Sequence, residues 1–235
     1  MQADAFPVAA SDRMVTIMVS DYIMKTMGYV LFKHNILKYN LTKKDLPPDE
    51  KGFLNTTCSG IACFGILIPQ AAKAFPNASV ELEMFASSYP TATISSTDIQ
   101  GNLAGIIAYK ARLSNGSLVP MFRTKVSVVV NLAVSLSEMV LRGNITKLSP
   151  TIHVDETQIG PIPDFILNGV FNLAAKLFIL PKLNTFGQKG LPIPAIKYVQ
   201  FTNTKLENDN HCLRISTDVK YSPSTGVLRF LPRDP

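Results

Sequence analysis

The middle of the chain alternates apolar and polar residues with a period of two. Leu103–Leu113 and Phe122–Leu136 place apolar side chains at nearly every second position, and Met139–Ile145 continues the pattern. Such alternation is typical of strands with one buried and one exposed face. Phe122–Leu136 is far longer than the usual strand of roughly five or six residues. Long strands with one apolar face predict a curved antiparallel sheet.

The same alternation predicts shorter strands on both sides of this region. They are Met14–Val19, Leu37–Leu41, Val80–Met84, Thr91–Ser96, Val199 to the polar turn Glu207–Asn210, and Leu213–Tyr221. Ser20 is a favourable N-cap, and the period changes after it, so Asp21–Lys33 is predicted to be a helix. Residues 43–60 are polar and predict a loop, and a short helix is expected within Phe64–Phe75.

The longest helix is predicted over Pro163–Lys189. Proline is tolerated in a first turn, and the following Asp164 places a negative charge where the helix dipole favours it. Gly190, followed by Pro192, supplies the stop signal. These signals predict one helix of more than twenty residues in the second half of the chain.

This helix is apolar around most of its circumference. Its polar residues, Asp164, Asn168, Asn172 and Lys176, recur every four positions and form one narrow stripe. A helix of this kind must be enclosed by protein or lipid. Lys176 and Pro181 interrupt the apolar run below the roughly 20 residues that a membrane span needs, so no transmembrane segment is predicted.

These elements predict an α+β fold in which a long, highly curved antiparallel sheet wraps around one long apolar helix, with a second helix alongside. A chain of 235 residues can bury one large core. Residues 12–222 are expected to form a single domain, between a flexible segment at 1–11 and a tail at 223–235.

The formal net charge is +6 and the pI is near 9.2, which favours anionic partners. The basic residues are spread thinly, and Lys43–Lys44 is the only adjacent pair. The charge is therefore interpreted as a mildly basic surface, and no nucleic-acid partner is expected.

Five N-x-[ST] sequons occur in the chain, and each falls on a predicted turn, loop or outward strand face: Asn40, Asn55, Asn77, Asn115 and Asn144. This distribution predicts a secreted, glycosylated protein. The N-terminus MQADAFPVAASDRM has no apolar core of a signal peptide. Sequons without a leader indicate a mature piece or shortened product of a longer secreted protein.

Three cysteines leave their pairing partly open. Cys58 and Cys63 are close enough in sequence to bridge a small loop, which leaves Cys212 over or paired with a partner outside the chain. Three such positions do not form a zinc site, which needs four ligands in paired spacings. No metal is expected.

Enzyme signatures are absent from the sequence. It contains no G-x-S-x-G elbow, P-loop or HExxH motif, and its three histidines are scattered. Asp155 and Glu156 are adjacent on a predicted strand, so they are expected to point to opposite faces and not to act as an acid pair. His153 is interpreted as a surface residue. The sequence therefore predicts a protein that is not an enzyme, with a hydrolase kept as a remote alternative.

Four ordered motifs resemble a known family. Ser20–Tyr22 opens a helix directly after a strand, and Ile68–Asn77 leads from a short helix into a strand. Ile159–Pro161 opens the long helix, and Gly190–Pro194 closes it. In this order and spacing, over residues 12–222, the chain resembles the C-terminal domain of the bactericidal/permeability-increasing protein and lipopolysaccharide-binding protein family, whose fold is called tubular lipid-binding.

The resemblance implies a barrel-like sheet around the long helix and an apolar pocket for the acyl chains of a phospholipid. It also implies that the chain is the second half of a two-domain protein whose N-terminal domain, absent here, carries most of the basic lipopolysaccharide-binding surface. The expected partners are phospholipid or another acyl lipid, bacterial lipopolysaccharide and that N-terminal domain. No cofactor is expected beyond bound phospholipid as ligand.

The pocket lining is expected from the inner faces of both helices, with plain core packing as the alternative at each position. The candidate residues are Ile23, Met24, Met27, Leu31, Val170, Phe171, Ala174 and Phe178. Two functions are therefore carried forward. The first is a secreted lipid-binding or lipid-transfer domain in innate defence against bacterial envelope lipids, or a carrier of another apolar ligand. The second is a glycosylated interaction module that docks to a receptor or lipoprotein without exchangeable lipid.

Overall fold

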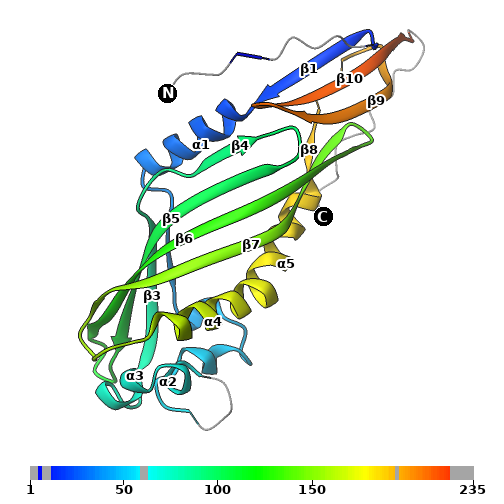
Figure 1. Cartoon of the computed structure of the whole chain (residues 1–235). Helices are drawn as coiled ribbons and strands as arrows, with labels where there is room; N and C mark the ends of the chain where they lie inside the picture. Colours follow the sequence, from blue (N-terminus) through cyan, green and yellow to red (C-terminus); the bar gives the residue numbers. More distant parts are fainter. Residues whose placement is uncertain (1–4, 7–11, 59–62, 194–195, 223–235) are drawn as a thin grey trace.

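The computed structural model of the chain describes residues 5–6, 12–58, 63–193 and 196–222. The predicted terminal segments 1–11 and 223–235 therefore lie almost entirely outside the described residues. A large curled sheet occupies the middle of the molecule, a three-stranded sheet lies at one end, and two short helices, α2 and α3, lie at the other (Figure 1). The boundary of a single domain at 12–222 stays a prediction.

The large sheet is antiparallel, and its hydrogen-bonded order is β2-β3-β5-β6-β7-β8, with β4 paired to β5. Its strands are β2 Lys38–Leu41, β3 Ser79–Ala86, β4 Thr91–Ile94, β5 Ile99–Arg112, β6 Leu118–Ser137, β7 Val140–Thr157 and β8 Leu191–Pro192. The predicted strands are thus confirmed, but β6 and β7 extend well beyond their alternating cores.

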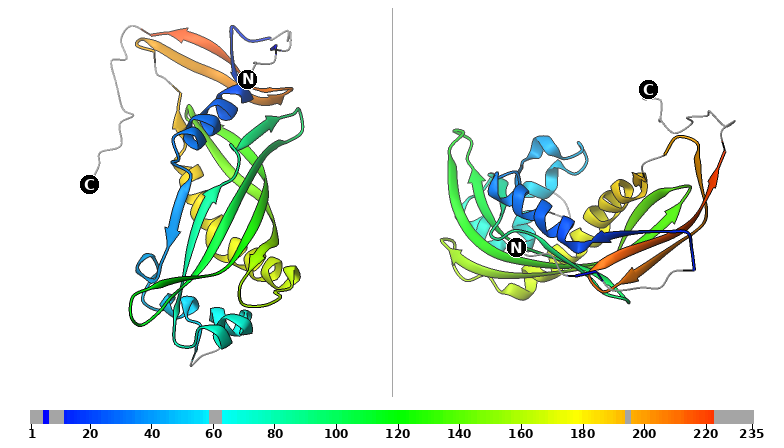
Figure 2. Two further views of the ribbon diagram at one scale, coloured as in Figure 1. Left: turned by 90° about the vertical axis from the view of Figure 1, so that its left-hand side faces the viewer. Right: turned by 90° about the horizontal axis from the view of Figure 1, so that it is seen from above.

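The sheet is strongly curled, and seen from above, α1 and α5 lie on its open side (Figure 2). Its register shifts once between β5 and β6, at Tyr109/Lys110, and twice between β6 and β7, at Arg123/Thr124 and Asn131/Leu132. Bulges of this kind increase local twist and bend the strand that carries them. The curl predicted from long one-faced strands is confirmed.

The smaller sheet has the order β1-β10-β9 and joins the two ends of the described chain. Its strands are β1 Val15–Ser20, β9 Val199–Asp209 and β10 Cys212–Tyr221. Leu213 packs with Ile94 and Ile99 in a core that links this sheet to the tips of β4 and β5. The predicted closing hairpin is therefore β9–β10, and the first strand completes its sheet.

Helix α1 spans Asp21–Lys33, as the sequence predicts. The Ser20 hydroxyl caps it by accepting a hydrogen bond from the Tyr22 backbone N–H at 3.1 Å. The expected short helix is two helices, α2 Phe64–Leu67 and α3 Pro69–Ala74. The polar loop contains two 3₁₀ turns, Lys43–Asp45 and Lys51–Leu54.

The long helix is confirmed, but it is not a uniform α-helix. It comprises α4 Asp164–Ala174, a π-helical turn Ala175–Ile179 and α5 Leu180–Lys189. Pro181 accounts for the irregular turn, because proline has no N–H to donate and its ring clashes with the carbonyl four residues earlier. The irregular turn at Pro181 is not predicted from the sequence pattern, which indicates one continuous helix.

Asp164 and Asn168 of the polar stripe, and Asn184 further along the helix, bind the edge of β7. The Asn168 side-chain amide accepts from the Ile152 N–H and donates to the Ile152 carbonyl, both at 2.8 Å. Asn184 makes the same pair of bonds to Ile145, at 2.7 and 3.2 Å. Asp164 accepts from the Val154 N–H at 2.9 Å. These side chains replace a neighbouring strand, so the helix covers a sheet edge that would otherwise be open.

Asp164 also accepts a hydrogen bond from His153, whose Nδ1 lies 2.7 Å from Oδ2. The backbone bond from Val154 and then the contact with His153 lower the pKa of Asp164. His153 is a surface residue, as expected, and it also stabilises the start of α4.

The expectation that Asp155 and Glu156 point apart is wrong. The bulge opposite Arg123 pairs that residue with Glu156 and leaves Asp155 unpaired in the register. Both carboxylates therefore contact the Arg123 guanidinium, at 2.7 and 2.8 Å. Lys125 and Arg123 lower the pKa of Asp155. The two acids form an ion-pair cluster with Arg123 and Lys125 on the sheet surface.

Candidate functional site

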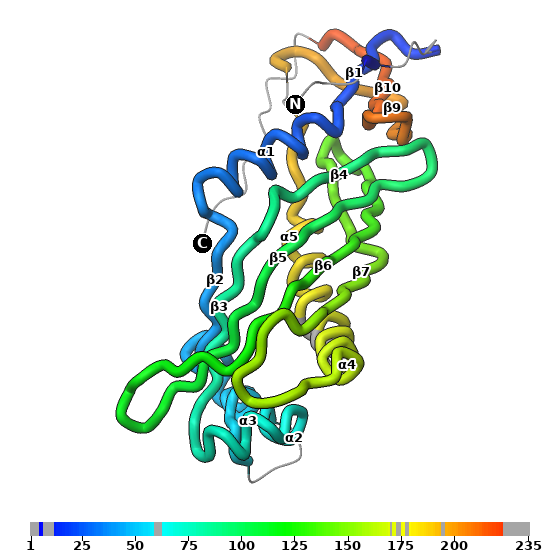
Figure 3. Tube along the Cα trace, turned by 60° about the vertical axis from the view of Figure 1, so that its left-hand side comes forward, coloured from blue at the N-terminus to red at the C-terminus, as the bar shows by residue number. Residues whose placement is uncertain are grey.

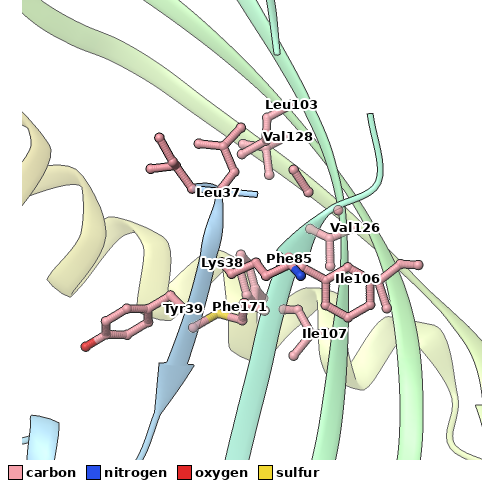
Figure 4. A pocket seen from close by; sticks show the side chains of 14 residues that line it. Leu37, Lys38, Tyr39, Phe85, Leu103, Ile106, Ile107, Val126, Val128 and Phe171 are labelled. Carbon is pink, nitrogen blue, oxygen red and sulfur yellow. The ribbon is translucent and has the colours of Figure 1, made fainter. Parts of the chain in front are cut away.

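A cavity of about 390 Å³ lies against the inner face of the large sheet (Figure 4). Its walls come from the start of β2, from β3, β5 and β6, and from one residue of α4. The lining residues are Ile36, Leu37, Lys38, Tyr39, Met84, Phe85, Ala86, Leu103, Gly105, Ile106, Ile107, Val126, Val128 and Phe171. The volume falls within the roughly 300–1,000 Å³ that is usual for small-molecule sites.

The register of the strands explains why these apolar side chains meet. Leu103 and Gly105 share one face of β5, and they pair with Val128 and Val126 of β6. Phe171 reaches this wall from α4 because the neighbouring Asn168 anchors the helix to β7. A wall of aliphatic and aromatic side chains offers few hydrogen-bond partners, so the cavity suits a hydrocarbon chain better than a polar substrate.

Lys38 is the one charged side chain of the cavity lining. It lies on β2, the edge strand of the sheet, opposite Phe85 of β3. No ion pair of Lys38 is found among the described residues. Because Phe85 pairs in turn with Ile106, the Lys38 side chain lies on the sheet face opposite Leu103 and Gly105, at the open edge of the cavity and not within its wall. An ammonium group at this edge is suited to the acidic end of an amphipathic ligand.

The structure brings together only part of the predicted lining. Phe171 lines the cavity, whereas Ile23, Met27 and Leu31 line a separate, open groove on the surface of α1. Met24 packs instead against the core that contains Leu213. The side chains of Val170, Ala174 and Phe178 lie outside the described residues. The two helices therefore do not share one cavity among the described side chains.

The sheet residues of the cavity are not among the predicted lining residues. Their signal was present, because Leu103 and Ile107 belong to the alternating pattern of β5. The prediction of a sheet wrapped around the long helix implies that this apolar face of β5 packs against the helix. The helix lies along the β7 edge, which leaves part of the inner face of β5 and β6 free to form a cavity.

The five sequons differ in exposure. Asn40, Asn77 and Asn115 are exposed, whereas Asn55 and Asn144 are half-buried. Asn115 lies in the β5–β6 turn, where its side-chain oxygen accepts from the Ser117 N–H at 3.0 Å. Glycosylation at all five stays a prediction, and exposure ranks the first three as the more accessible acceptors.

Cys58 and Cys63 form a disulfide, with their Cα atoms 6.1 Å apart. Cys212 has a free thiol and is fully buried at the start of β10. In the register of the small sheet it lies opposite Ser20 of β1. Burial raises the pKa of its thiol. A partner outside the chain therefore does not reach Cys212 while β1 and β10 remain paired.

Within the ranges that the structure describes, no group of three or more metal-ligating side chains is found. None of the helices in those ranges is both long and apolar enough to cross a bilayer.

A curled antiparallel sheet, a long helix on its edge and an apolar cavity define an α+β protein of the half-barrel kind. Residues 2–221 match the model of the LBP / BPI / CETP family, C-terminal domain. The chain belongs to this family, and the resemblance noted from its four motifs is confirmed. The family comprises lipid-binding and lipid-transfer proteins and not enzymes, so the expectation of a non-enzymatic protein is confirmed at that level.

Two relatives and one solved structure give the extent of the likeness. The chain is 25% identical to a bactericidal permeability-increasing protein of Sebastes schlegelii, over 90% of this chain and 44% of the relative. It is 25% identical to a lipopolysaccharide-binding protein of Bos taurus, over 93% of this chain and 46% of the relative. A crystal structure of lipopolysaccharide binding protein matches with a TM-score of 0.66 and 19% identity, over 94% of this chain and 47% of that one. The chain thus spans less than half the length of these relatives.

Proposed function

We propose that this chain is a secreted lipid-binding domain that holds the acyl chains of a phospholipid in the cavity of the large sheet. The observation that carries the proposal is the apolar cavity of about 390 Å³ between the sheet and Phe171. Burial contributes about 0.8 kcal/mol per methylene, so about ten buried methylenes would supply about 8 kcal/mol without any specific polar contact. The names of the relatives support a role in innate defence against bacterial lipopolysaccharide.

The direct test is native mass spectrometry of the chain secreted from glycosylating cells, followed by organic extraction. We expect one phospholipid per chain and a mass that also reports the occupied sequons. A folded, lipid-free chain that takes up no phospholipid from vesicles would contradict the proposal. The alternative of an interaction module without exchangeable lipid would then be favoured.

Filling the cavity is expected to prevent lipid uptake. Leu103 lines the cavity and is 43% exposed. Tryptophan at this position would place a bulky indole ring in the space of the ligand. We expect the Leu103→Trp chain to retain about tenfold less co-purifying phospholipid, which the same mass spectrometry measures; tenfold is ~1.4 kcal/mol, or about two buried methylenes.

The matched control is Leu118→Trp, because Leu118 is also 43% exposed but lies at the start of β6, outside the cavity lining. This variant is expected to retain lipid as the unaltered chain does. Equal retention by both variants would assign the bound lipid to another site.

Lys38 is expected to favour ligands with an acidic headgroup. In the Lys38→Met chain the length of the side chain is kept and its charge is lost. The preference for phosphatidylglycerol over phosphatidylcholine should fall about fivefold, the equivalent of ~1 kcal/mol for a partly exposed ion pair. Lipid competition followed by extraction measures this ratio.

Lys147→Met is the control for the charge change, because Lys147 is an exposed residue of β7 outside the cavity lining. An unchanged ratio in the Lys38 variant would show that the cavity does not select the headgroup by charge.

A further inference from the structure

The outward face of α5 carries large apolar side chains that stay exposed. Phe186 is 68% exposed and Leu183 is 42% exposed, and Ile179, the last residue of the preceding π-helical turn, is 36% exposed. Just beyond the helix, Leu191 is 71% exposed. Contiguous exposed apolar side chains of this size mark an interaction surface more often than an idle one.

The orientation of this face is fixed by contacts on the other side of the helix. Asn184 binds the backbone of Ile145, and Gly187 packs against the backbone of Gly143. These contacts place one side of α5 on β7. Phe186 lies on the opposite side of the helix from Asn184, whereas Leu183, one turn before Gly187, lies at the margin of the exposed face. Figure 3 shows α5 running toward β8 and the three-stranded sheet.

Lysines flank the apolar strip. Lys182 and Lys189 are exposed on α5, and the Lys189 Nζ lies 5.3 Å from the centre of the Phe186 ring. Neither lysine forms an ion pair with a described residue, whereas Lys110 and Lys125 of the large sheet pair with acids across the strands.

The segment that contains α5 has basic residues but no acidic ones. Residues 165–206 contain five lysines and no acidic residue, so they carry +5 of the formal net charge of +6. Elsewhere basic and acidic residues are mixed. Lys205 pairs with Glu207, but Lys182 and Lys189 form no ion pair among the described residues, so the α5 surface combines an apolar strip with two uncompensated positive charges.

From this combination we propose that the outward face of α5, with Leu191, is a docking surface for an anionic phospholipid bilayer. In this arrangement Phe186 and Leu183 enter the interface while Lys182 and Lys189 extend to the headgroup phosphates, as amphipathic lysines do at interfaces. A protein partner fits less well, because lysine is depleted in protein–protein interfaces. The inference concerns a surface distinct from the cavity and holds whatever ligand the cavity carries.

Vesicle co-sedimentation of the full chain tests the proposal. The chain is expected to bind vesicles of phosphatidylcholine with phosphatidylglycerol, and to bind pure phosphatidylcholine vesicles about tenfold less. Raised salt should weaken the binding, because ions screen exposed charges. Failure to bind the anionic vesicles, or equal binding to both kinds, would overturn the proposal.

Variants assign the binding to this face. Phe186→Ser is expected to lower the bound fraction at least about fivefold, and Lys182→Glu with Lys189→Glu about tenfold, with loss of the salt dependence. The controls are Phe165→Ser, a phenylalanine on α4 with a similar exposure (74%), and Lys51→Glu; both variants should bind as the unaltered chain does.

Two further outcomes separate this surface from other sources of binding. The cavity-filling variant Leu103→Trp should still sediment with anionic vesicles, and its loss of binding would assign the effect to the cavity and overturn the inference. If Phe186→Ser turned a dimer into a monomer without changing vesicle binding, the face would be a contact between copies and the inference would be wrong. Unchanged circular dichroism of each variant confirms that it is folded.

Discussion

Replacing Gly187 by valine is expected to lower the free energy of unfolding by about 3 kcal/mol, as overpacking of a close contact does. A Cβ atom at this position would overlap the carbonyl oxygen of Gly143, which is backbone and cannot rotate away. Helix α5 would therefore have to move off the β7 edge, and Asn184 would lose its two bonds to Ile145. Thermal and denaturant unfolding, followed by circular dichroism, measure the change.

Gly169 provides a control of opposite sign. It lies in α4, and a Cβ atom there would meet nothing within 4 Å. Gly169→Ala is expected to raise the free energy of unfolding by about 0.5–1 kcal/mol, because alanine loses less conformational entropy in a helix. A Gly187 variant as stable as the unaltered chain would show that α5 does not depend on this close approach.

The second large effect is expected from Asn168→Ala. This change leaves the N–H and carbonyl of Ile152 without partners, although Ile152 is only 2% exposed. Buried unsatisfied groups cost about 1–3 kcal/mol each, and partial access of water from the sheet edge reduces the sum, so a loss of about 2 kcal/mol is expected. For a chain of this size that is a fall in Tm of roughly 4–8 °C.

Asn172→Ala is the matched control, one helical turn further along the same polar stripe. Its amide donates to the Asn168 carbonyl within the helix, at 2.7 Å, and makes no hydrogen bond to a strand among the described residues. A change within about 0.5 kcal/mol is expected, since surface substitutions away from special features have small effects. If the two variants lost equal stability, the bonds to β7 would not be what distinguishes Asn168.

The strands and helices were predictable because their signals are local. The alternation at Leu103–Leu113 depends only on neighbouring residues, and the cap at Ser20 acts within one turn of α1. The family could be recognised for a related reason, since its motifs mark the ends of these elements. The disulfide between Cys58 and Cys63 was also open to prediction, because five positions separate the two residues.

The candidate site was only partly predictable. Phe171 was selected for its place on an apolar helix, and it lines the cavity. Met27 was selected by the same reasoning, and it lies on an open groove of α1. Both are apolar residues at helical spacing, so the sequence pattern does not distinguish them. What distinguishes them is which strand each helix packs against.

Period-two and helical patterns by themselves determined that this protein has long one-faced strands, a capped first helix and a second helix with a narrow polar stripe. The tertiary structure decided what the stripe does. Asn168 and Asn184 bind the backbone of β7 across sixteen and thirty-nine residues of sequence, and this leaves room for the cavity beneath Phe171. An asparagine on a helix looks the same in sequence whether it meets water or a strand edge. The difference arises only when the sheet curls and the open part of the β7 edge needs a partner.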